Sequence, residues 1–134
     1  MNETVKSDVK IASKSAVTQA AKHFAEVLAN TTQFKEFDQA YHSFRQDTEA
    51  QNDIQEFQKK QESLKALLLL NAVSDEDRQE LQRLQDRFYQ QPTYVRTLKA
   101  QDDLMKICQE LGDQISKTIG LDYASSCRKG GCCG

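Results

Sequence analysis

The placement of glycine and proline constrains the fold of this chain more than any other feature. The 134 residues contain one proline, Pro92, and five glycines, of which the first is Gly112. Glycine and proline are the main residues that mark turns and interrupt regular elements. A body with so few of them excludes most β-sandwiches, β-barrels and phosphate-loop α/β folds, and it predicts a chain made largely of helices.

Composition narrows the class of protein further. The chain carries 18 Lys and Arg residues against 20 Asp and Glu residues, a net charge of −2, and 38% of its residues are hydrophobic. Nucleic-acid-binding domains usually concentrate Lys and Arg into a strongly basic surface, so we expect no direct sequence-specific binding of nucleic acid. The modest apolar content suits helices with one apolar stripe each, or a protomer that completes its core with a partner.

No segment is expected to enter a membrane or to direct secretion. Residues 1–12 are polar and lack the apolar region of a signal peptide. The longest apolar run, residues 66–70, is far shorter than the roughly 18 residues that a membrane helix needs. We therefore expect a cytoplasmic protein without membrane insertion, whose cysteines stay reduced.

Apolar residues recur at helical spacing along five segments. The predicted helices run from about Thr4 to Ala29, from a cap at Thr31 or Thr32, from a cap at Asp47 or Thr48, from a cap at Ser74, and from Pro92 to a glycine cap at Gly120. Short connections favour antiparallel neighbours. We predict an all-α, five-helix antiparallel assembly in which the third and fifth helices, the two longest, form the spine. Residues 1–120 would form the helical domain and residues 121–134 a flexible Gly/Cys tail.

The clearest amphipathic signal is a stripe of aromatic residues in the second predicted helix. Phe34, Phe37, Tyr41 and Phe44 follow one another at spacings of three, four and three residues. Aromatic platforms for nucleic-acid bases normally come with a basic groove, and this segment has only Lys35 and Arg45. The stripe is therefore interpreted as core or as a partner interface.

Three cysteines near the C-terminus form the only candidate site for chemistry. Cys127, Cys132 and Cys133 could supply thiolates, which are soft ligands suited to zinc or to iron–sulfur clusters. Their spacing matches no standard zinc pattern, so incidental cysteines in a tail remain the alternative. The fourth cysteine, Cys108, lies on an apolar stripe and is expected to be a buried core residue.

The other polar candidates have ordinary explanations. His23 and His42 lack a partner at the spacing of a metal or catalytic motif, so packing or surface roles are favoured. The basic stripe of the first predicted helix is interpreted as a solvated face rather than a phosphate-binding surface; it consists of Lys6, Lys10, Lys14 and Lys22. The sequence contains no catalytic motif that we can identify, and we expect that the protein is not an enzyme.

Several segments follow one another in a recognisable order and spacing. They are Leu28-Ala29, Phe34, Phe37 and Ala40, residues 47–51 with Ile54, Phe57 and Gln61, Gln91-Pro92 with Leu98 and Ala100, and the predicted helix from Leu104 to Ile119. Together they resemble the YlbF/YmcA family of small bacterial helical regulators, over about residues 20–120.

This resemblance implies a non-enzymatic regulatory role in competence, sporulation and biofilm control. In the family, YlbF and YmcA work with a third protein, YaaT, in a complex that associates with endoribonuclease Y and directs mRNA maturation or decay. The resemblance thus implies YmcA-like and YaaT-like partners, endoribonuclease Y, and a homo- or hetero-oligomeric state.

The same resemblance implies an iron–sulfur cluster, because the family complex is associated with such clusters and the Cys-containing tail is similar to that of the YlbF branch. A Cys₄ cluster needs four thiolates, and the tail offers three. The expected cofactor is therefore a 4Fe–4S cluster shared with a partner or a second protomer. Two other functions stay open: a stand-alone thiol or metal redox sensor, and a structural helical dimer with an inert tail.

Overall fold

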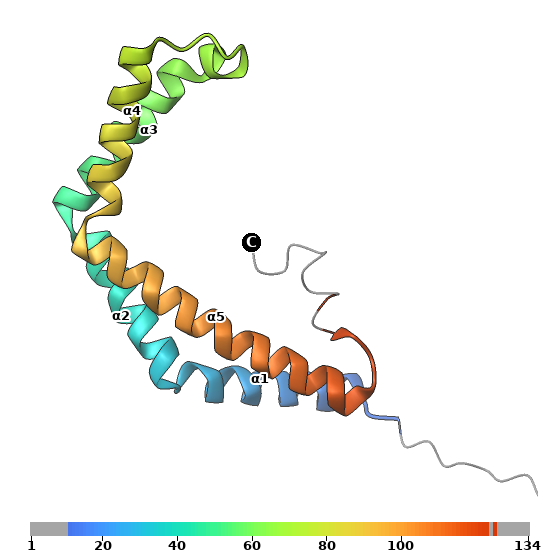
Figure 1. Cartoon of the computed structure of the whole chain (residues 1–134). Coiled ribbons are helices and arrows are strands. Elements are labelled where there is room, and N and C mark those ends of the chain that lie inside the picture. Colours follow the sequence, from blue (N-terminus) through green and yellow to red (C-terminus); the bar gives the residue numbers. More distant parts are fainter. Residues whose placement is uncertain (1–10, 124, 126–134) are drawn as a thin grey trace, which may run out of the picture. The chain divides into compact units, whose positions relative to one another are not determined.

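The computed structural model describes residues 11–123 and residue 125. It contains the helices α1 (Lys14–Ala29), α2 (Thr32–Gln46), α3 (Thr48–Leu69), α4 (Asp75–Tyr89) and α5 (Pro92–Ile119) (Figure 1). No strand occurs within this described part. The all-α prediction is confirmed, and α3 and α5 are the longest helices, with 22 and 28 residues.

The first helix begins later than predicted. Residues 11–13 are not helical, and the Ser13 side chain accepts a 3.1 Å hydrogen bond from the backbone N–H of Ala16. A serine at this position satisfies one of the free N–H groups of the first turn and so favours a helix start there. The expectation of a helix running unbroken from about Thr4 to Ala29 is therefore wrong at residues 11–13.

The chain divides into two compact units, Met1–Thr31 and Thr32–Gly134. The described helix of the first unit is α1, in which no residue is buried; Val17 and Val27 are both more than half exposed. The second unit contains α2 to α5. The division into a helical domain of residues 1–120 and a tail of residues 121–134 remains a prediction.

The ends of the longer helices follow the local signals in the sequence. Asp47 caps α3 through a 3.1 Å bond from the Ala50 N–H to Oδ1, and Ser74 caps α4 through a 3.2 Å bond from the Asp77 N–H. Pro92 is the first residue of α5, where its missing N–H costs nothing. Gly120 ends α5 with a φ of 70°, a left-handed conformation that favours glycine.

Within the second unit the helices form antiparallel pairs, α3 with α4 and α2 with α5 (Figure 1). Arg96 Nε of α5 lies 2.8 Å from Glu36 Oε1 of α2, and Thr93 Oγ1 donates to Asp47 Oδ2 at 2.7 Å. Residue numbers therefore run in opposite directions along the two helices at this contact. Each long helix is the longer member of one pair.

Small residues sit where α2 and α5 meet. Ala40 and Ala100 are 0% and 3% exposed, and Thr97 Oγ1 of α5 reaches across to the Ala40 carbonyl at 3.1 Å. Alanine at a helix contact lets two backbones approach closely. The α3–α4 pair instead buries larger side chains, Leu64, Leu84 and Phe88.

Candidate functional site

The α2–α3 and α4–α5 connections meet in one region, which we call the double junction. Asp47, which begins α3, is bonded to Thr93 at the start of α5. Asp53, in the second turn of α3, accepts a 2.5 Å bond to Oδ2 from the Gln91 amide that precedes α5. These contacts couple the two helix pairs at the point where each connection changes direction.

Asp53 is a buried carboxylate with several partners. It is 6% exposed, and its Oδ1 lies 2.8 Å from Arg87 Nε of α4. The two groups form an ion pair at this distance, but the buried Arg87 Nε–H has no acceptor in hydrogen-bond geometry. Arg87 Nη2 instead donates to Glu56, and this bond is the main cause that raises the pKa of Arg87. The arrangement leaves the Asp53 oxygens engaged rather than free for acid–base chemistry.

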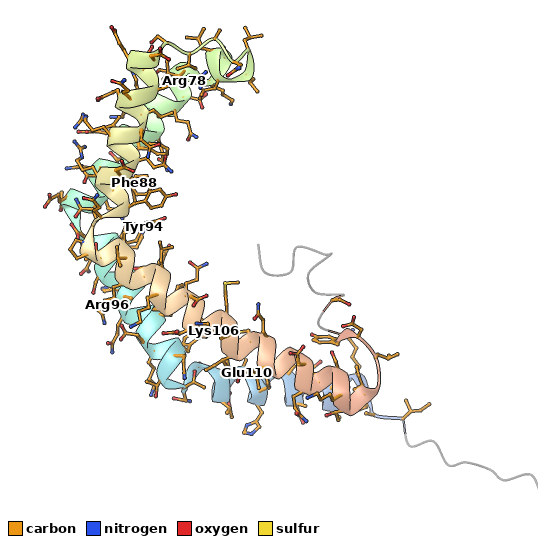
Figure 2. The ribbon with its side chains drawn as sticks, in the orientation of Figure 1. Arg78, Phe88, Tyr94, Arg96, Lys106 and Glu110 are labelled. Atoms are coloured by element: carbon orange, nitrogen blue, oxygen red, sulfur yellow. The ribbon has the colours of Figure 1, made fainter. Side chains whose placement is uncertain are left out.

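Aromatic rings from all four helices of the second unit form one connected cluster. Phe88 lies 4.5 Å from Tyr89, 5.2 Å from Phe57 and 5.3 Å from Tyr94 between ring centroids, and Phe44 lies 5.5 Å from Tyr94. Figure 2 shows Phe88 and Tyr94 on neighbouring parts of α4 and α5. Burial raises the pKa of Tyr94, with a smaller contribution from Tyr89. The cluster therefore packs the double junction.

The predicted aromatic stripe of α2 is divided by this packing. Phe44 belongs to the cluster, whereas Phe37 stacks on Tyr41 at 5.9 Å, and Tyr41 is 45% exposed. Phe34 is half-buried. Phe44 is half-buried as well, and a partner interface formed by Phe34, Phe37, Tyr41 and Phe44 remains a prediction.

The candidate ligands Cys127, Cys132 and Cys133 lie outside the described residues. Cys108 is exposed, so its expected place in the core is wrong. The inward-facing stripe of α5 passes through the half-buried Leu104, Ile107 and Leu111, and Cys108 lies about 100° around the helix from Ile107.

The remaining polar candidates do not form a metal-binding cluster in the part of the chain that the structure describes. No group of three or more His, Cys, Asp or Glu residues among the described residues is placed to hold a metal ion. His23 and His42 are exposed, as are Lys14 and Lys22 of the basic stripe, while Lys6 and Lys10 lie outside the described part. Sequence reasoning missed Asp53 because its polar surroundings, Gln51-Asn52-Asp53, indicate a solvated face.

Asp47 predicts a specific acid sensitivity. The bond from Thr93, and then that from the Ala50 N–H, hold the pKa of Asp47 below its ordinary value of 3.8. A lowered pKa means that the charged form stabilises the fold above about pH 4, and that this stability is lost as the pH falls through the folded-state pKa. We expect Asp47→Asn to flatten part of the fall in the free energy of unfolding below about pH 4, measured by urea unfolding.

A threonine pair provides the control for this prediction. Thr93→Val removes the principal donor and should reproduce much of the flattening seen with Asp47→Asn. Thr118→Val should leave the pH curve unchanged, because the Thr118 hydroxyl bonds the Gln114 carbonyl of its own helix at 2.8 Å. Equal pH curves for Thr93→Val and the unmodified protein would contradict the prediction.

A comparison with models of protein families matches residues 17–120 to the family described as "Control of competence regulator ComK, YlbF/YmcA". The match covers most of the chain and reaches from α1 to the glycine that ends α5. The chain belongs to the YlbF/YmcA family. The resemblance stated from the sequence is thereby confirmed, and the three tail cysteines lie beyond the matched residues. Searches of curated proteins and of solved structures gave no match.

Membership in the YlbF/YmcA family connects the chain with control of a competence regulator. Among the described residues, every helix is too short or too polar to cross a bilayer.

Proposed function

We propose that this YlbF/YmcA-family protein is a non-enzymatic regulatory adaptor. It assembles with YmcA-like and YaaT-like chains and modulates RNA processing by endoribonuclease Y, and through it competence, sporulation and biofilm formation. The family match over residues 17–120, whose description names control of the competence regulator ComK, is the observation that carries the proposal.

Two features of the described residues support an adaptor. The carboxylates of the double junction are held in contacts that stabilise the fold, which leaves Asp47 and Asp53 committed to structure. At the same time, large apolar side chains remain exposed on more than one helix. Among them are Phe24 of α1, Leu98 of α5 and Leu69 of α3. Exposed apolar residues can gather into patches that serve as protein–protein contact sites, and Leu69 belongs to a run of four exposed leucines, Leu67–Leu70.

The proposal includes an iron–sulfur cluster shared between chains. Cys127, Cys132 and Cys133 supply three thiolates, and a Cys₄ cluster takes four. The tail alone therefore does not fit a complete cluster, and the fourth ligand comes from a partner or a second protomer.

An anaerobic pull-down of this chain from its native host tests the adaptor function, with iron and sulfide assayed on the eluate. We expect endoribonuclease Y and at least one further YlbF/YmcA-family chain to co-elute. Recovery of the chain alone, under conditions that keep endoribonuclease Y intact, would contradict the proposal. A change of oligomeric state of the isolated protein with zinc or peroxide would favour the redox sensor instead.

The tail cysteines yield a separate prediction. We expect Cys127→Ser combined with Cys132→Ser to leave the helix content and melting temperature unchanged, because the α5 helix ends before them, and to remove the brown colour and the sulfide from the purified complex. Circular dichroism and visible absorption measure the two effects.

Cys108→Ser is the matched control for the cluster. This thiol is exposed on α5, and the complex carrying Cys108→Ser should keep its colour if the fourth ligand comes from another chain. A colourless unmodified complex, prepared without oxygen, would count against the cluster itself.

A further inference from the structure

The tip of the α3–α4 hairpin carries a run of four exposed leucines, Leu67–Leu70, which we call the leucine tip. Leu69 and Leu70 are 82% and 76% exposed, and Leu67 and Leu68 are 40% and 39% exposed. Consecutive residues of a helix point in different directions, so α4 cannot cover all four. Single exposed leucines are normal on proteins, whereas a contiguous group marks a contact surface.

A hydrogen-bonded turn follows the leucine tip and connects it to α4. The Ala72 N–H donates to the Leu67 carbonyl at 2.8 Å, and Asn71 adopts a left-handed φ of 50°. Arg78 of α4 clamps the turn, since Nη2 donates to Asn71 Oδ1 at 2.9 Å and Nε donates to the Val73 carbonyl at 3.4 Å (Figure 2). Val73, only 7% exposed, anchors the turn in the hairpin.

A hollow of about 370 Å³ adjoins the leucine tip on α3. It is lined by Gln61, Glu62, Lys65, Leu68 and Leu69. Its lining thus combines two of the four leucines with three polar residues. A hollow of this kind accepts aliphatic side chains from an amphipathic helix, which is a recurrent mode of peptide recognition.

The unpaired charge beside the leucine tip is negative. Arg78 is engaged with the turn, and Lys65 lies 3.7 Å from Glu62. Asp75 and Glu76, which open α4, are exposed and have no ion-pair partner in the described part of the chain. A partner would therefore gain from Lys or Arg residues that face these two carboxylates.

We propose that the leucine tip binds an amphipathic helix of another protein, with apolar side chains in the hollow and flanking Lys or Arg residues against Asp75 and Glu76. The proposal goes beyond the adaptor function and rests on this surface alone. A helix of another protein fits this surface better than a second copy of this chain or an anionic lipid surface.

A second copy of this chain fits poorly because of charge. Contact tip to tip would bring two sets of exposed carboxylates, Asp75 and Glu76 of each copy, together. An anionic lipid surface is disfavoured by the same carboxylates, since such surfaces attract basic segments.

Fluorescence anisotropy with two synthetic helical peptides tests the proposal on the full chain. The peptides share a leucine face and differ only in flanking residues, Lys and Arg in one and Asp and Glu in the other. We expect the basic peptide to bind at least tenfold more tightly than the acidic one. Leu69→Ser with Leu70→Ser should weaken its binding at least tenfold, and Asp75→Asn with Glu76→Gln should weaken it several-fold and reduce its salt dependence.

Leu121→Ser is the matched control, because Leu121 is 70% exposed and lies outside the hairpin; its binding should equal that of the unmodified chain. Circular dichroism verifies that each variant is folded. Absence of binding, equal affinity for both peptides, or undiminished binding to the Leu69/Leu70 variant would overturn the proposal. So would a dimer in sedimentation, or binding to phosphatidylglycerol vesicles, that disappears in that variant.

Discussion

Replacing Phe88 with alanine should lower the free energy of unfolding by about 3–5 kcal/mol, the range typical of a large aromatic removed from a core. Phe88 is 8% exposed, and its ring meets Phe57, Tyr89 and Tyr94 at the double junction. The substitution deletes the contacts that join α4 to both α3 and α5. Urea unfolding followed by circular dichroism measures the effect.

The size of this loss matters because domains are typically stable by only about 5–15 kcal/mol. We expect Phe88→Ala to be partly unfolded at 37 °C. Phe88→Leu keeps much of the volume and should cost less. Phe24→Ala, at a position 44% exposed on α1, should change stability by no more than about 1 kcal/mol. Similar losses for the variants at Phe88 and Phe24 would show that the aromatic cluster is not the core of the unit.

Replacing Asp53 with alanine should lower the free energy of unfolding by about 1–3 kcal/mol, because the Gln91 amide would lose its acceptor and Arg87 would lose an ion-pair partner. The Gln91 amide and the buried Arg87 Nε both face this carboxylate, at 2.5 Å and 2.8 Å. Their desolvation persists in the variant without compensation. The same urea unfolding experiment measures the loss, which we expect to fall mainly on the junction between α3 and the start of α5.

Glu56 supplies the matched control for Asp53. Its side chain is 55% exposed and contacts the same arginine, so Glu56→Ala should cost much less than Asp53→Ala, as is usual for surface ion pairs. Asp53→Ala combined with Arg87→Met should recover part of the loss, since removing both partners costs less than orphaning one. Equal losses for Asp53→Ala and Glu56→Ala would contradict the buried network.

Local sequence signals are sufficient to predict a helix end where that end depends only on neighbouring residues. Asp47, Ser74, Pro92 and Gly120 were identified from the sequence and occupy the helix ends in the structure. A cap bonds a backbone group three residues away, and a proline or a glycine restricts its own φ, so no distant residue is needed. The same logic explains the start of α1 at Lys14, because the Ser13 side chain accepts a bond from the Ala16 N–H three residues on.

Burial was harder to infer from periodicity. Cys108 lies on a stripe of apolar residues in the sequence, yet it is exposed. Residues spaced by three and four cover a wider strip of the helix surface than the strip of α5 that is half-buried. Asp53 is the opposite case, because its polar neighbours in the sequence indicate exposure and yet it is buried. Its burial depends on Arg87 and Gln91, which are distant in sequence and approach only when α3 and α4 pair.

The amino-acid sequence by itself determined the helical class, most of the helix ends, the YlbF/YmcA family and the three cysteines near the C-terminus, since each depends on residue type and short-range spacing. Only the tertiary structure decided which helices pair, which carboxylate is buried and which leucines stay exposed. Those properties depend on contacts between segments far apart in the chain, and on the limited area that one helix can cover on another.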